Sequence, residues 1–195
     1  MARPRAFDRD QVLDIAIEVF RQKGFDGTST DDLINAMQIG RQSLYATFGD
    51  KRSLYLEALR RYNTNSIVDL LDARRDATSP RQTIEALLLA FAEQAGQPAA
   101  SACLGVNSIC EFGTSDDDVV RINHESGQTL QRFLERNLRE AQSLGEVDKT
   151  LDPRGAAQFI AVTLMGMKVS ARAGADAATL RNIAQMALRS LDSPL

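Results

Sequence analysis

Four helical segments follow one another within about the first sixty residues, and the two in the middle are very short. Asp8 is a suitable cap for the first segment, and Gly24 suits its C-terminal end. The second segment begins in the cap-rich run 28–32, the third spans 41–48, and the fourth begins near Lys51. A simple helical bundle does not use such short helices, whereas a helix-turn-helix does. The spacing therefore predicts a helix-turn-helix.

Helical patterns continue to the end of the chain, and no stretch alternates apolar and polar residues with a period of two. New helix starts are indicated at Ser79-Pro80, Ser115-Asp116, Asp152-Pro153 and residues 174–176, and a further helix runs through Cys103-Leu104 to Glu111. We expect an all-α protein of about nine helices. Residues 1–50 are predicted to form a helix-turn-helix domain, and residues 51–195 a larger helical domain.

The composition excludes several classes of protein. With 2 Cys and 1 His in 195 residues, the chain lacks material for a disulfide scaffold and for most His/Cys metal sites. His124 is the one candidate base for nucleophilic catalysis, so we predict no catalytic residue, no metal and no cofactor. No apolar run approaches the roughly 18 residues of a membrane span, and the N-terminus has no signal stretch, so we expect a cytoplasmic protein.

Charge is distributed unevenly along the chain. The net charge is −3, but the residues up to Arg61 contain ten basic and nine acidic side chains, and the remainder thirteen and seventeen. The first part is thus +1 and the second −4. Affinity for phosphate, if present, is expected at the N-terminus and must come from the local placement of cations.

The segment from Thr28 to Leu54 carries the most informative motif. It reads Thr-Ser-Thr-Asp-Asp-Leu at 28–33 and Ile-Gly-Arg-Gln-Ser-Leu-Tyr-Ala-Thr-Phe at 39–48, followed by Lys51. In these residues the chain resembles the TetR family of bacterial one-component transcription regulators. The resemblance covers about the first third of the chain, and the remainder matches the family only in its layout of helices.

The resemblance implies a homodimeric regulator of double-stranded DNA, with a small-molecule cavity among the central helices. It makes residues 1–50 the DNA-binding domain and residues 51–195 the effector-binding and dimerisation domain. It implies a four-helix interface from the last two helices of each subunit, and a helix from about Lys51 that relays effector binding by tilting the helix-turn-helix. Two residues depart from the family pattern. Gln38 replaces the usual Gly, which predicts a non-Gly residue at positive φ. Gly40 replaces the usual Ser or Thr, which removes a side-chain cap.

Helical spacing predicts which side of segment 41–48 faces DNA. Leu44 and Phe48 share the inner face, and Ile39 anchors the turn. Arg41 and Gln42 have the donor patterns that suit guanine and adenine edges in the major groove. The remaining candidate DNA contacts are helix N-termini, hydroxyls and cations. They are Arg3, Arg5, Ser29, Thr30, Ser43, Tyr45, Thr47 and Lys51.

Dimerisation is expected because one short recognition helix covers too few base pairs, whereas a two-fold dimer spans two half-sites of a palindrome. Met165, Gly166, Met167 and Gly174 would allow close approach of helices. We predict that the apolar face of the last helix completes the interface; the alternative is that this face packs only inside its own subunit. The face consists of Leu180, Ile183, Ala184, Ala187, Leu188 and Leu191.

The sequence says little about the effector. Asn107, Asn123 and Lys168 are polar residues within apolar helices and are candidates for the effector site. Cys103 is a candidate sensor because it lies near a helix N-terminus, where the dipole favours a thiolate. The alternative is that Cys103 is a small buried apolar residue, and this role is predicted more strongly for Cys110.

The sequence therefore predicts a ligand-responsive transcriptional regulator, most simply a repressor, that binds a palindromic operator as a homodimer. Two alternatives stay open. One is a thiol-based sensor of oxidants or electrophiles that uses Cys103, and the other is a helical interaction module without DNA binding. An enzyme has no support beyond the isolated His124 and Cys103.

Overall fold

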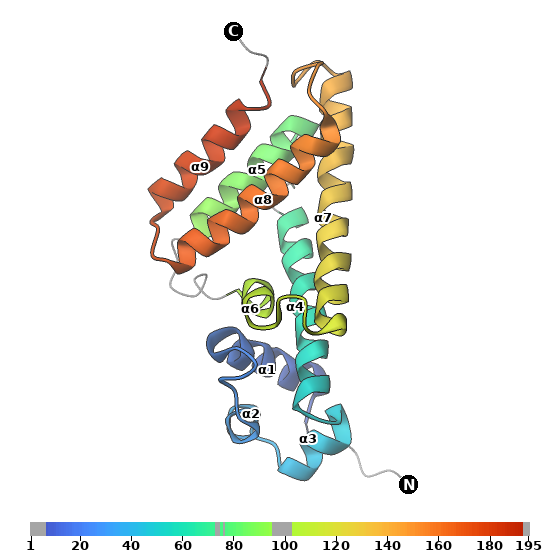
Figure 1. The fold of residues 1–195 in the computed structure, drawn as a ribbon, viewed down its shortest axis with the longest axis vertical. Coiled ribbons are helices and arrows are strands. Elements are labelled where there is room, and N and C mark those ends of the chain that lie inside the picture. The colour runs from blue at the N-terminus through green and yellow to red at the C-terminus, as the bar shows by residue number, and fades with distance from the viewer. Residues whose placement is uncertain (1–6, 73–74, 76, 95–102, 193–195) are drawn as a thin grey trace. The chain divides into compact units, whose positions relative to one another are not determined.

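The computed structural model describes residues 7–72, 75, 77–94 and 103–192, and every regular element within these ranges is an α-helix (Figure 1). The predicted all-α class and the expected number of helices are confirmed for these ranges. The helices are α1 (Arg9–Lys23), α2 (Thr30–Met37), α3 (Arg41–Phe48), α4 (Lys51–Asp72), α5 (Pro80–Gln94), α6 (Leu104–Phe112), α7 (Asp117–Ser143), α8 (Pro153–Arg172) and α9 (Ala177–Arg189).

Capping residues determine where several helices begin and end. The Asp8 carboxylate accepts the backbone N–H groups of Asp10 and Gln11 at 2.9 and 3.3 Å, and α1 ends at Gly24 with φ 73°. Asp152 caps α8 immediately before Pro153, and Asp176 caps α9. These side chains satisfy N–H groups that have no partner within the helix. The caps expected from the sequence at Asp8 and Gly24 are therefore confirmed.

The described residues divide into two compact units. The first unit comprises residues up to Thr64 and residues from Cys103 to Asn123; the second comprises the rest. The first unit thus contains α1, α2, α3 and α6, and the second contains α5, α8 and α9. Helices α4 and α7 each contribute residues to both units.

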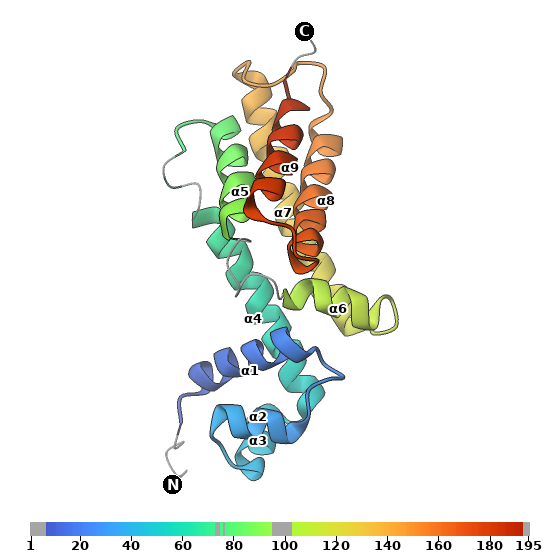
Figure 2. The ribbon, with the colours of Figure 1, turned by 90° about the vertical axis from the view of Figure 1, so that its left-hand side faces the viewer.

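The core of the first unit includes residues far apart in the sequence. Leu104 of α6 and Ile122 of α7 are buried in the same apolar cluster as Phe20 of α1 and Leu44 of α3. The Tyr55 ring of α4 lies 5.0 Å from Phe20, centroid to centroid. Helix α6 therefore packs as part of the unit that contains the two short helices, and Figure 2 shows it beside α1.

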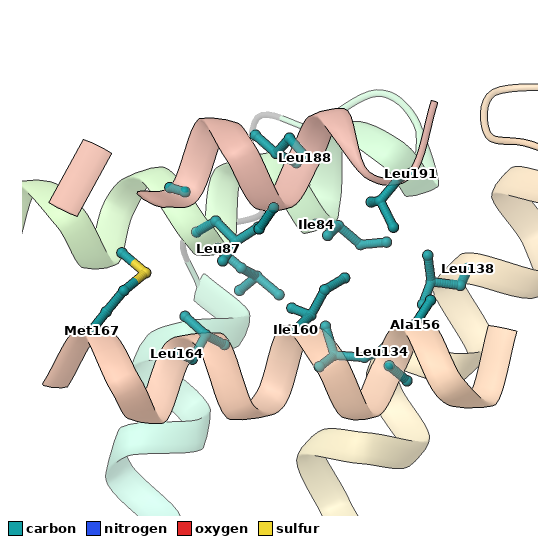
Figure 3. Packing of buried hydrophobic residues seen from close by; sticks show 14 of the residues in the cluster. Ile84, Leu87, Leu134, Leu138, Ala156, Ile160, Leu164, Met167, Leu188 and Leu191 are labelled. Atoms are coloured by element: carbon teal, nitrogen blue, oxygen red, sulfur yellow. The ribbon is translucent and has the colours of Figure 1, made fainter. Parts of the chain in front are cut away.

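The core of the second unit is formed by α5, α8, α9 and the C-terminal part of α7. Figure 3 shows Leu87, Leu134, Ile160 and Leu188, one from each helix, pointing toward one another. Burial of these aliphatic side chains is the main source of stability for such a unit.

The apolar face of α9 is therefore occupied within its own subunit. Its buried members are Leu180, Ala184, Ala187 and Leu188, and Ile183 packs against the same cluster, as does the buried Leu191 just after the helix. This burial agrees with the alternative that the face packs inside its own subunit, because helical periodicity identifies an apolar face but not what covers it; a dimer through the last two helices stays a prediction. Met167, which is also predicted to allow close approach of helices at the interface, is buried as well, whereas Met165 is 47% exposed.

Candidate nucleic-acid interface

Helix α3 has one buried and one exposed face, as the spacing predicts. Leu44 and Phe48 are 0% and 6% exposed, and both belong to the core of the first unit. The remaining side chains of α3 are exposed or half-buried, and they belong to Arg41, Gln42, Ser43, Tyr45, Ala46 and Thr47. The inner pair fixes the helix, so its polar side is presented on a rigid support.

The turn between α2 and α3 takes an unusual backbone conformation. Gln38 has φ 53° and ψ 40°. Among the described residues, it is the only one other than glycine that has a positive φ. The expectation that this turn uses a non-Gly residue at positive φ is confirmed. Gly40 caps α3 without a side-chain hydrogen bond, also as expected. Ile39, buried between them, anchors the turn in the core.

The N-terminus of α2 is closed by a capping box. The hydroxyl of Ser29 accepts the Asp32 backbone N–H at 3.0 Å, and the Asp32 carboxylate accepts the Ser29 backbone N–H at 2.8 Å. Lys23 also donates to Asp32. Hydrogen bonds from Lys23 and Ser29 hold the pKa of Asp32 far below its ordinary value. Ser29, a predicted phosphate contact, thus already forms hydrogen bonds within the protein. Thr30, the next predicted contact, is half-buried.

Lys51, at the start of α4, has partners within the first unit. Its Nζ donates to the carbonyl oxygens of Phe25 and Thr28, both at 2.9 Å, and lies 4.0 Å from the centroid of the Phe25 ring. Next to it, the Asp50 carboxylate accepts the Ser53 backbone N–H at 2.7 Å, which lowers the Asp50 pKa. The lysine therefore joins α4 to the turn after α1, a role that the sequence did not indicate.

Arg41 is paired with Asp31 of α2. The Nη2 atom of Arg41 lies 2.5 Å from Oδ1 of Asp31, and the two side chains are 55% and 73% exposed. Arg41 occupies the first position of α3, directly after the cap Gly40. The predicted contacts Arg3 and Arg5 lie outside the described residues.

The candidate effector residues do not gather in one unit. In the first unit, the side-chain N–H of Asn107 donates to the Arg21 carbonyl at 3.0 Å, and that of Asn123 donates to the Ser108 hydroxyl at 2.9 Å. Cys103 is buried at the cap position of α6. Lys168 belongs to the second unit, 6.0 Å from the centroid of the Phe91 ring.

Cys110 is exposed, so the prediction that it is a buried apolar residue is wrong. It follows Ile109, which is 41% exposed, on the side of α6 that the core does not cover. The buried apolar residues of α6 are Leu104 and Val106 instead.

The sequence reasoning also missed Glu111. Its carboxylate accepts the backbone N–H groups of Phe25 and Asp26 at 3.0 and 3.3 Å. No local pattern in the sequence connects residues 25 and 111. The Ser29–Asp32 box, in contrast, had a usable signal, since Ser followed three residues later by an acidic residue is typical of capping.

Within the part of the chain that the structure describes, no group of three or more His, Cys, Asp or Glu side chains is placed to hold a metal ion. Among the same residues, no helix is sufficiently long and apolar to traverse a bilayer. What the site offers is an exposed helix with Arg, Gln and hydroxyl donors, which is a surface for recognition by hydrogen bonds.

Comparison with known proteins agrees with this interpretation. Residues 12–58 match the family model described as bacterial regulatory proteins, tetR family, and residues 80–187 match the tetracyclin repressor-like C-terminal domain. The HTH-type transcriptional repressor ComR of Escherichia coli K12 is 30% identical over 194 residues, covering 96% of this chain and 90% of the repressor. The HTH-type regulator YezE of Bacillus subtilis is 29% identical over 194 residues, covering 98% of this chain and all of YezE.

Solved structures show the same fold. A cysteine mutant of the TetR-family regulator CifR, solved with 26-base-pair operator DNA, has a TM-score of 0.82 and 31% identity, covering 96% of this chain and 99% of its own. The reduced form of Escherichia coli NemR has a TM-score of 0.85 and 19% identity, covering 95% and 97% of the two chains. At that identity the NemR match shows the fold alone.

Proposed function

Because the chain belongs to the TetR family of bacterial regulatory proteins, we propose that it represses genes by binding a palindromic operator as a homodimer. The protein is a DNA-binding transcriptional regulator rather than an enzyme. The observation that carries the proposal is the exposed side of α3, held by the buried Leu44 and Phe48. Its site of action is the cytoplasm, where the chromosome lies.

Arg41 and Gln42 are the proposed base-reading residues. Both are exposed, and both lie in the first turn of α3, the end of a recognition helix that contacts base edges. Arg binds the O6 and N7 atoms of guanine, and Gln binds the N6 and N7 atoms of adenine, each with two hydrogen bonds. Each such pair is worth about 1–3 kcal/mol of discrimination.

The other candidate residues are proposed to position the protein on the DNA backbone. Tyr45 is 45% exposed and Thr47 is half-buried, and their hydroxyls suit phosphate oxygens. Ser43 and Thr30 also have hydroxyls that can bind phosphate. The Ser29 hydroxyl and the Lys51 ammonium already donate hydrogen bonds within the protein, so a phosphate would have to share these donors. Arg3 and Arg5 are proposed to enter the minor groove as an arm.

The homodimer is proposed to form through α8 and α9 by a face other than the predicted one. Phe159, Val162 and Val169 are 48%, 68% and 50% exposed, and their spacing of three and seven residues puts them on one side of α8. Gly166 lies between them with open space around its Cα, which permits close approach of another helix. Met186 of α9 is 62% exposed. Large apolar residues exposed together mark an interaction surface.

An effector is proposed to act through residues 51–195. Helices α4 and α7 contribute to both compact units, so a change in the second unit has a covalent route to the first. Such regulation requires that the effector bind one arrangement of the dimer more tightly than the other. Asn107, Asn123 and Lys168 remain candidate effector residues, and Cys103 the candidate thiol.

Replacing Cys103 by serine separates two modes of effector action. A thiol sensor would lose its response to an electrophile while its operator binding stays unchanged. A regulator with a non-covalent effector would keep its response in the Cys103→Ser variant, because the substitution changes one buried atom.

Selection of duplexes from a random DNA pool tests the proposed function. We expect the full chain to enrich a palindromic sequence, and the affinity for it to fall steeply with salt as phosphate contacts release counterions. A chain that enriches no sequence, or whose binding does not depend on salt, would contradict the proposal and favour an interaction module without DNA binding.

A further inference from the structure

Asp31 forms an ion pair with Arg41, the proposed base-reading arginine. Its Oδ1 accepts one hydrogen bond from Nη2 of Arg41, across the gap between α2 and α3. Asp31 is in the first turn of α2, and Arg41 is in the first turn of α3. Both side chains are more than half exposed, so the ion pair is accessible from solvent.

The pairing leaves most of the guanidinium available. Arg has five N–H donors in a planar fork, and the contact with Asp31 uses one nitrogen and one carboxylate oxygen. The other donors are sufficient for a two-bond contact with guanine while the carboxylate stays in place. The ion pair and base reading are therefore compatible.

We propose that Asp31 is a specificity-determining positioning residue, whose carboxylate holds Arg41 in the orientation that reads a base pair. The inference rests on the proposed base-reading role of Arg41. A free Arg side chain samples many rotamers, and fixing it before binding removes part of the cost of ordering it on the operator. Asp31 does not itself contact the base.

The charge of Asp31 alone would have a different effect. A carboxylate near DNA repels phosphate on every sequence, so its removal raises the affinity for operator and random DNA alike. The ratio of operator affinity to random-duplex affinity cancels this uniform effect. Positioning of Arg41 raises this ratio, because only the operator has the base that Arg41 binds at the correct place.

The experiment measures this ratio for the wild type, Asp31→Asn, Arg41→Ala and the double variant, with an operator selected from a random duplex pool. We expect Asp31→Asn to lower the ratio roughly two- to tenfold, the cost of ordering one long side chain. The loss should concentrate at the base pair that Arg41→Ala also affects. In the Arg41→Ala background, Asp31→Asn should leave the ratio unchanged.

Asp26→Asn is the matched control. Asp26 is exposed in the turn before α2, and its substitution removes the same charge from the same unit. We expect it to leave the ratio unchanged. An unchanged or higher ratio in Asp31→Asn, or a loss that persists without Arg41, would overturn the inference while the proposed function stands. Failure of the wild type to select any operator would overturn both.

Discussion

The carboxylate of Glu111 accepts a hydrogen bond from the backbone N–H of Phe25 at 3.0 Å, although 86 residues separate them in the chain. Its second oxygen accepts the N–H of Asp26, and Asn107 on the same helix donates to the Arg21 carbonyl. Helix α6 therefore binds the C-terminal end of α1 by polar contacts as well as through the apolar core. A residue distant in sequence from the helix-turn-helix thus fixes the turn that leads into it.

Loss of this contact should weaken the first unit. In Glu111→Ala both N–H groups lose their acceptor, and we expect the free energy of unfolding to fall by about 1–3 kcal/mol, since each of the two hydrogen bonds has a net value of about 0.5–1.5 kcal/mol. Urea unfolding measures the change. Glu125→Ala, at an exposed position of α7 in the second unit, is the control and should change stability by less than about 0.5 kcal/mol. Equal stability of Glu111→Ala and wild type would show that the contact contributes nothing.

Gly24 is required where α1 ends. Its φ is 73°, and a Cβ there would lie 2.3 Å from Oε1 of Glu111. We expect Gly24→Ala to destabilise the protein by more than about 1 kcal/mol, since a left-handed backbone and a clash both oppose the methyl group.

Gly127→Ala is the control for Gly24→Ala. Gly127 lies inside α7, and a Cβ there meets nothing within 4 Å. Alanine is the better helix former, so this variant should gain stability by up to about 1 kcal/mol. Thermal unfolding of both variants should thus show shifts of opposite sign, and shifts of the same sign would contradict the account.

The capping box at α2 predicts a pH-dependent contribution to stability. Hydrogen bonds from Lys23 and Ser29 lower the pKa of Asp32 below its ordinary value of 3.8. A carboxylate with a lowered pKa in the folded state stabilises it fully above the unfolded pKa, and this contribution is lost as the pH falls toward the folded value. The melting temperature of the wild type should exceed that of Asp32→Asn by a constant amount above about pH 5, and the difference should shrink below about pH 4. A difference that stays constant down to pH 3 would exclude this linkage.

A single charged substitution should disrupt the proposed dimer interface. Val162 on α8 is 68% exposed, and Val162→Glu should dissociate the dimer, since an uncompensated carboxylate in an apolar interface is costly. Light scattering coupled to gel filtration measures the mass. Val120→Glu places the same charge at a valine that is 38% exposed on α7 in the first unit, and it should remain a dimer. A dimeric Val162→Glu variant would show that this face is not the interface.

The elements of the helix-turn-helix could be predicted from the sequence because their signals are local. The Asp8 cap, Gly24, and the pair Leu44 and Phe48 each depend on residues within a few positions of one another. The left-handed Gln38 could be predicted as well, because the turn requires positive φ whichever residue occupies it.

The contacts that join distant segments could not be predicted in this way. The positive charge of Lys51 suggested a phosphate, but the carbonyl groups of Phe25 and Thr28 lie within reach only after folding. Leu188 marks an apolar face of α9, yet periodicity does not tell whether α5 of the same chain or a second subunit covers it. The pairing of Asp31 with Arg41 likewise depends on the angle between two helices.

The claim on which the account depends is that the exposed side of α3 reads bases. The most direct test replaces each base pair of the selected operator in turn and measures the affinity of the wild type and of Gln42→Ala for every duplex. For the wild type, we predict that replacing one particular base pair per half-site weakens binding by about 1–3 kcal/mol. For Gln42→Ala the same replacement should leave the affinity unchanged, while replacements at the other positions weaken binding as they do for the wild type. A Gln42→Ala variant with the same cost at every position as the wild type would contradict base reading by this side of the helix.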